Sequence, residues 1–145
     1  VMGFSSELVY KNWDFSFAMH ANIGSYAYNN VLSNRVAYGG ADLYDPSGFF
    51  KNRMNAAKDL NFLTPQYQSS YYVQKTSFLR MDNISLGYTF NDSKIPGSLR
   101  IYASVQNPFV ITSYKGLDPE FSNEGIDNNI YPRPRTFLLG LSYNF

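Results

Sequence analysis

Hydrophobic and polar side chains alternate with a period of two over residues 13–24. Every second residue from Trp13 to Ile23 is apolar, whereas most residues between them, from Asp14 to Gly24, are small or polar. Successive side chains of a β-strand point to opposite faces of a sheet, so this segment is predicted to be a strand with one apolar and one polar face. Twelve residues span roughly 40 Å, or about 28 Å of height at a 45° tilt, which is close to the apolar band of an outer-membrane barrel.

The residues before this segment are predicted to form a hairpin with it. A two-residue turn at Lys11 and Asn12 places Tyr10 opposite Trp13, and apolar residues then face one another along the pair, with Ser6 as the exception. Asn12, at the second turn position, is expected to take the positive φ that tight hairpins need.

Three further strands are predicted from the same alternation. They cover Phe78–Phe90, where the later half alternates most clearly, Leu99–Asn107 and Thr136–Phe145, where only Leu138 interrupts the polar face. A short helix is expected around Asn52–Asn61.

The connections between these strands alternate in length. Those at residues 11–12 and 91–98 are short, and the second contains Pro96 and Gly97, whereas those at residues 25–75 and 114–135 are long. Short periplasmic turns and long outer loops are typical of bacterial outer-membrane barrels. Seven aromatic residues lie near the short-turn ends on the apolar faces, as in the aromatic girdle of a membrane interface: Tyr10, Trp13, Phe15, Tyr88, Phe90, Tyr143 and Phe145.

Composition narrows the function classes. Charged residues make up 16% of the 145 residues, the net charge is +1, and aromatic residues make up 18%. No basic field suggests nucleic acid as a partner. Cysteine is absent and His20 is the single histidine, which excludes disulfide scaffolds and thiolate sites and disfavours a histidine-rich metal cluster or a Ser-His-Asp set. We therefore expect no catalytic role, no metal and no cofactor.

The sequence predicts no transmembrane helix, because its longest apolar run, as at Phe137–Leu139, is only a few residues long. Barrels nevertheless span membranes with strands of this alternating kind. Five strands do not close a barrel, and open sheet edges in lipid leave backbone groups unpaired. The chain starts at Val1 without a leader sequence, so we expect a mature chain or a fragment. It would be the C-terminal piece of a larger barrel or would assemble with copies of itself.

Three ordered stretches resemble the C-terminal end of the SusC/RagA family of TonB-dependent outer-membrane transporters. They are Thr76–Tyr88, Tyr114–Glu120 and Tyr131–Phe137, the last continuing to Phe145. The likeness covers about residues 76–145, and residues 1–75 carry no comparable motif. It implies a 22-stranded transmembrane antiparallel barrel with a plug, of which residues 1–145 would supply about the last five strands.

The resemblance also implies partners and cargo. A SusD-like surface lipoprotein would capture cargo, the TonB complex would act on a region absent from this chain, and oligosaccharides would be imported. Peptide import, as in RagA-like members, is the alternative. The C-terminus would be periplasmic, and an outer-membrane assembly signal read by the barrel-assembly machinery would consist of alternating apolar residues before a terminal aromatic: Phe137, Leu139, Leu141, Tyr143 and Phe145.

Individual polar residues have plainer interpretations. His20 on the polar face could be a ligand or proton site, but a hydrogen-bonded wall residue is the simpler interpretation. Asp14 and Arg100 would pair with other residues of the lumen or plug. The acidic segment 118–129 could be imagined as a calcium site, yet it lacks EF-hand spacing and fits a solvated loop.

The aromatic residues of the long connections could line an outer vestibule, because aromatic faces stack on sugar rings and hold peptides. The candidates for ligand or partner contact are Tyr38, Tyr44, Tyr67, Tyr71 and Tyr72. The alternative is that they pack the loops together.

Two other architectures stay open at this stage. A soluble β-sandwich carbohydrate-binding module would bury the apolar faces between two sheets, but it does not explain the ordered loop lengths. A passive porin or adhesin barrel has the same strand physics, and only the motif resemblance argues against it.

Overall fold

The computed structural model describes residues 1–36, 55, 64, 66–91, 97–121, 125–128 and 131–145. They belong to two compact units, and the chain passes from one unit to the other several times. The first unit comprises residues 1–24, 77–113 and 132–145, and the second comprises residues 25–76 and 114–131.

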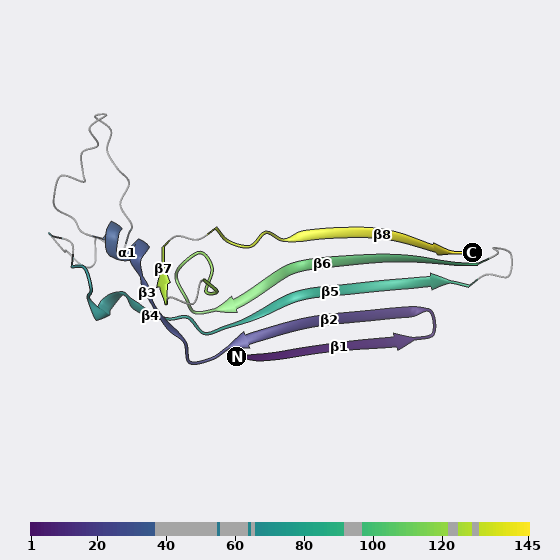
Figure 1. Cartoon of the computed structure of the whole chain (residues 1–145), viewed down its shortest axis with the longest axis horizontal. Coiled ribbons are helices and arrows are strands. Elements are labelled where there is room, and N and C mark those ends of the chain that lie inside the picture. Colours follow the sequence, from purple (N-terminus) through teal and green to yellow (C-terminus); the bar gives the residue numbers. More distant parts are fainter. Residues whose placement is uncertain (37–54, 56–63, 65, 92–96, 122–124, 129–130) are drawn as a thin grey trace, which may run out of the picture. The chain divides into compact units, whose positions relative to one another are not determined.

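The first unit is a five-stranded antiparallel sheet (Figure 1). Its strands are β1 (Met2–Tyr10), β2 (Trp13–Asn22), β5 (Phe78–Phe90), β6 (Ser98–Thr112) and β8 (Thr136–Asn144), which neighbour one another in that order. The five long strands neighbour one another in the order in which they occur along the chain. The sheet is therefore a meander, with β1 and β8 at its edges.

The register of the sheet separates its side chains into two faces. Directly paired residues point to the same side, and one row across the sheet reads Phe15, Leu86, Ala103 and Leu139. We call the side that carries this row the apolar face. We call the opposite side of the sheet the polar face. The neighbouring row of paired residues lies on it and reads Asp14, Gly87, Tyr102 and Gly140. The predicted alternation of the five strands is therefore present in the structure.

The β1–β2 hairpin has the predicted register but a different turn conformation. Tyr10 pairs with Trp13 and Phe4 with Met19, as expected. The positive φ, however, belongs to Lys11 at 54°, whereas Asn12 does not have one. The prediction for Asn12 was wrong because a two-residue hairpin turn can place its left-handed residue first.

Strand β5 contains an irregularity near its start, and β6, which pairs with it there, is longer than predicted. Between Met81 and Asn83 the pairing of β5 shifts against both neighbouring strands, which leaves Asp82 as a bulge residue. Opposite the bulge, Asn107 has a φ of 50°. The continuation of β6 to Thr112 was not predicted, because a proline directly follows Asn107 and prolines usually mark the end of a strand.

The second unit holds shorter elements. Strand β3 (Tyr26–Asn29) pairs antiparallel with β4 (Val73–Lys75) and parallel with β7 (Ile126–Asp127). Helix α1 (Asn30–Arg35) follows β3, and the 3-10 helix η2 (Ser70–Tyr72) precedes β4. The described residues of this unit include a small hydrophobic cluster of Leu32, Val36 and Tyr72, with Tyr28 packed against it.

Local hydrogen bonds explain where α1 begins. The side-chain oxygen of Asn29 accepts a hydrogen bond from the Leu32 backbone N–H at 2.8 Å, which caps the helix at its first turn. The helix expected around Asn52–Asn61 lies outside the described residues, apart from Asn55. No helix among the described residues is long and apolar enough to cross a membrane.

Candidate functional site: the two faces of the sheet

The polar face carries an ion pair across three strands. Arg100 on β6 donates from Nε to Asp14 Oδ2 on β2 at 2.9 Å, and its Nη2 also contacts Asp14 Oδ1. Gly87 on β5 lies directly between them, and a Cβ built on it would lie 2.3 Å from Asp14 Oδ2. The ion pair therefore occupies the space that any other side chain at Gly87 would need.

A second glycine on the polar face is covered by an aromatic ring. Tyr102 on β6 pairs with Gly140 on β8, and a Cβ at Gly140 would lie 2.2 Å from the ring carbon Cζ of Tyr102. The guanidinium carbon of Arg100 lies 4.9 Å from the centroid of the same ring. Asp14, Arg100 and Tyr102 thus form one continuous layer over the two glycines.

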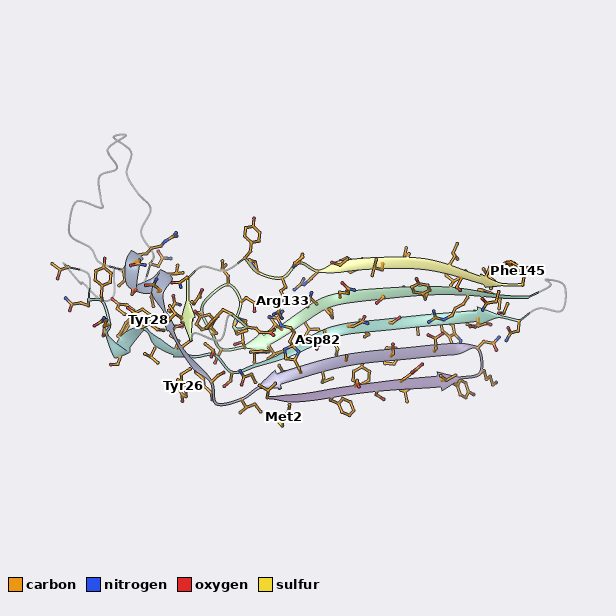
Figure 2. The ribbon with its side chains drawn as sticks, in the orientation of Figure 1. Met2, Tyr26, Tyr28, Asp82, Arg133 and Phe145 are labelled. Atoms are coloured by element: carbon orange, nitrogen blue, oxygen red, sulfur yellow. The ribbon has the colours of Figure 1, made fainter. Side chains whose placement is uncertain are left out.

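The bulge at Asp82 lies on the part of the sheet farther from the short turns, near His20. Asn83 belongs to this face, so strict alternation would turn Asp82 toward the apolar face. The bulge instead brings Asp82 Oδ2 to within 2.8 Å of His20 Nδ1, and Figure 2 labels Asp82 in this part of the sheet. Re-aiming a side chain is a recognised effect of bulges, and here it keeps a carboxylate off the apolar face.

The middle of the polar face offers small hydrogen-bonding groups. Ser104 Oγ donates to Asn83 Oδ1 at 2.8 Å. A shallow hollow beside this pair is lined in part by Ser5, Ser16 and Glu7. Such a surface suits contact with water and polar solutes.

The apolar face is exposed in this chain and ends in aromatic residues at the short-turn end. Trp13 and Tyr88 contact each other with ring centroids 4.7 Å apart, and Tyr88 and Phe90 do so at 4.6 Å. Leu139 on the edge strand β8 is 86% exposed. An exposed apolar surface of this size marks an interaction site with lipid or protein.

The strand expected to carry the assembly signal is the edge strand β8. It presents Phe137, Leu139, Leu141 and Tyr143 on the apolar face, and Phe145 follows its last residue. Its backbone pairs with β6 on one side only. The other edge of β8 is thus open for strand addition in this chain.

The motif at residues 114–120 folds into a compact loop in the second unit. The ring of Tyr114 lies against the backbone of Gly116, where a Cβ would come within 2.1 Å of ring carbon Cε1. The Tyr114 hydroxyl donates to buried Asp127 at 2.5 Å. Burial first, and this hydrogen bond second, raise the pKa of Tyr114 above its ordinary value. Asp118 is buried as well, and its Oδ1 accepts from the Glu120 backbone N–H at 2.9 Å.

These hydrogen bonds account for two acidic residues of segment 118–129, Asp118 and Asp127. Asp118 and Asp127 each bind a donor of their own loop. In the parts of the chain that are described, no group of three or more His, Cys, Asp or Glu side chains is placed to hold a metal ion.

The tyrosine candidates of the long connection separate into two kinds. Tyr67 and Tyr71 are 61% and 49% exposed, whereas Tyr72 is fully buried in the core of the second unit. Tyr72 packs edge to face against Tyr28, with ring centroids 5.9 Å apart, and burial raises its pKa. It is a packing residue here. Tyr38 and Tyr44 lie outside the described residues.

Sequence reasoning missed three features of these faces. The roles of Gly87 and Gly140 and the re-aimed Asp82 depend on cross-strand register. The only sequence signal was that glycines occupy polar-face positions of otherwise regular strands, where they weaken the strand unless something covers them.

Comparison with known proteins gives a consistent result. The chain is 43% identical over its whole length to the TonB-dependent receptor SusC of Bacteroides thetaiotaomicron, and 30% identical over 99% of its length to the TonB-dependent receptor P3 of Formosa agariphila. No family model matches the chain.

Solved structures of the RagAB peptide importer share the fold. In its closed-closed state that importer matches 99% of this chain with a TM-score of 0.75 at 21% identity, and a second RagAB structure gives 0.74 at 22%. The chain spans only 15% and 16% of the two receptors' lengths and 17% of each RagAB chain.

The sheet is thus a fragment of a larger β-barrel. The predicted family is confirmed by the likeness to SusC, which extends over residues 1–75 as well as over the three motifs. The chain belongs to the SusC/RagA family of TonB-dependent outer-membrane receptors, of which it forms a C-terminal barrel segment.

Proposed function

We propose that this chain forms part of the barrel wall of a TonB-dependent outer-membrane importer that takes up oligosaccharides. The observation that carries the proposal is the 43% identity to SusC over the whole chain. In this role the apolar face contacts hydrocarbon, and the polar face lines the lumen through which cargo passes.

The chemistry of the polar face supports a passage for polar cargo. Serine hydroxyls, the Asn83 amide and the Asp14–Arg100 pair present donors and acceptors that a hydroxyl-rich solute can use in place of water. Cargo is moved rather than converted in this role, so we assign no bond-making or bond-breaking step to these residues.

Peptide import is the second candidate function. It is favoured by the fold likeness to the RagAB peptide importer. The identity to those structures is about half of the identity to SusC, at 21% and 22% against 43%. We therefore rank oligosaccharide import first.

The partners of the complete receptor follow from the same proposal. A SusD-like surface lipoprotein captures the cargo, the TonB complex acts on a part of the receptor outside this chain, and a plug closes the lumen. The barrel-assembly machinery recognises β8, and the C-terminus faces the periplasm together with the two short turns. Of the five candidate tyrosines, Tyr67 and Tyr71 are those that the structure describes as accessible for contact with cargo or lipoprotein.

Uptake in the native bacterium tests the cargo. A strain that lacks the receptor is compared with its parent for uptake of fluorescent maltoheptaose, of a fluorescent decapeptide and of free glucose, which serves as the control. Loss of maltoheptaose uptake alone supports the first function, and loss of peptide uptake alone supports the second. Unchanged uptake of both, across oligosaccharides and peptides of several lengths and compositions, contradicts import by this receptor.

A further inference from the structure

The apolar face contains a hollow near the short-turn end. Apolar side chains make up most of its lining, together with Gly87 and Tyr102; they are those of Trp13, Leu86, Tyr88, Phe90, Ile101, Ala103 and Leu139. Ala103 is the small residue of its row, between Leu86 on β5 and Leu139 on β8. The larger neighbours stand above it on both sides, so the hollow exists because of alanine at this position.

One wall of the hollow consists of aromatic rings packed edge to face, which gives the hollow a defined shape. The Tyr88 ring contacts Trp13 and Phe90 edge to face, with ring centroids 4.7 and 4.6 Å apart, respectively. Rings locked against one another lose little further freedom when a ligand binds against them.

A cation lies at the short-turn end of the sheet, on the turn before β2, whose first residue Trp13 lines the hollow. Lys11 occupies the β1–β2 turn, two residues before Trp13, and its ammonium group lies 5.4 Å from the centroid of the Tyr10 ring. Tyr10 pairs with Trp13 and belongs to the apolar face. A positive charge at the interface and an apolar hollow deeper in the hydrocarbon match the two ends of a phospholipid.

We propose that this hollow is a specific phospholipid site, in which one acyl chain lies over Ala103 and the headgroup phosphate is held near Lys11. The inference rests on the proposed placement of the apolar face in the membrane. It goes further because it predicts a retained lipid molecule at one position, in contrast to the general contact that every barrel makes with its bilayer.

The hollow can be closed without touching the polar face. Replacing Ala103 by Leu adds three carbon atoms where the acyl chain would lie, while Val105→Leu enlarges the next outward residue of β6, which does not line the hollow. Val105→Leu is therefore the matched control. Lys11→Gln removes the charge without altering the hollow.

Native mass spectrometry of the complete receptor tests the proposal. The receptor is taken from the outer-membrane fraction in mild detergent, delipidated and titrated with dioleoyl phosphatidylethanolamine. We expect one phospholipid to bind to the native protein and to Val105→Leu. Lipid occupancy should fall about tenfold in Ala103→Leu, because the added carbon atoms exclude part of the acyl chain. It should fall about fivefold in Lys11→Gln, because one interfacial charge is lost.

Equal occupancy in the native protein, Ala103→Leu and Lys11→Gln would overturn the proposal, as would a second copy of the receptor seated on this face in place of lipid. If Ala103→Leu fails to fold, Lys11→Gln against the native protein still decides the matter. A receptor that is absent from the outer-membrane fraction would refute the proposed function itself, so the two failures are distinguishable.

Discussion

Gly87→Ala is expected to destabilise the barrel by breaking the Asp14–Arg100 ion pair. The new Cβ would lie 2.3 Å from Asp14 Oδ2 and 2.6 Å from Arg100 Nη2, whereas ordinary contacts begin near 3.4 Å. Asp14 Oδ2 and Arg100 Nη2 must therefore each move by roughly 1 Å, and we expect this to lengthen the present 2.9 Å bond from Arg100 Nε to Asp14 Oδ2 beyond hydrogen-bond range.

The expected cost is about 1–2 kcal/mol. A hydrogen bond to a charged group contributes about 1.5–3 kcal/mol, and water at the partly exposed pair, whose side chains are 24% exposed for Asp14 and 36% for Arg100, reduces that figure. Because water and salt screen such a pair, the effect of the substitution should shrink at high salt concentration.

The assay is the temperature at which the folded receptor loses its compact, faster-migrating form on unboiled gels. Gly87→Ala should lower this temperature in the native background and leave it nearly unchanged in an Asp14→Ala background, where no ion pair remains to be broken. Gly3→Ala is the matched control, because a Cβ at this glycine of β1 meets nothing within 4 Å. Equal losses in both backgrounds would refute the explanation.

Four further outcomes are expected. Gly140→Ala should destabilise the sheet by about 1–3 kcal/mol by displacing the Tyr102 ring, and a Tyr102→Ala background should remove this cost in the same gel assay. Tyr114→Phe should increase hydrogen exchange in segment 114–128, because buried Asp127 loses the hydrogen bond from the Tyr114 hydroxyl at a cost of about 1–3 kcal/mol. Unchanged exchange would show that this bond is dispensable. The pKa of Tyr114 is raised above its ordinary value of 10.0, so the protonated hydroxyl contributes fully to the stability of the segment below pH 10.0. This stability is lost as the pH rises toward the folded-state pKa. Hydrogen exchange of the segment should therefore accelerate in alkali more in the native protein than in Tyr114→Phe. Deleting Phe145 should lower the amount of folded receptor in the outer membrane, and an undiminished amount would argue against an assembly signal at the C-terminus.

The long strands could be predicted from the sequence because alternation and tight turns fix register. A two-residue turn leaves one register for the β1–β2 hairpin. Shifting this register by one residue would move every apolar side chain of β2 onto the polar face. The ion pair between Asp14 and Arg100 was only half predicted. Both were expected to face inward, but their pairing depends on β5 lying between β2 and β6 with glycine at residue 87.

The second unit was beyond sequence reasoning. Its strands β3, β4 and β7 have two to four residues, which is too few for a periodic signal. Tyr72 illustrates the consequence. It stands beside exposed Tyr71 in the same tyrosine-rich stretch, and only the turn of the chain at η2 decides which ring enters the core.

The central claim is that the apolar face contacts hydrocarbon while the polar face contacts water. Spin labels attached to single cysteines at Leu139 and at Ser104, in the complete receptor in lipid bilayers, test it most directly. We predict high accessibility to oxygen and low accessibility to a water-soluble nickel complex at residue 139, and the reverse at residue 104. A label at residue 139 that is shielded from oxygen inside protein, or open to the nickel complex, would contradict this placement of the sheet.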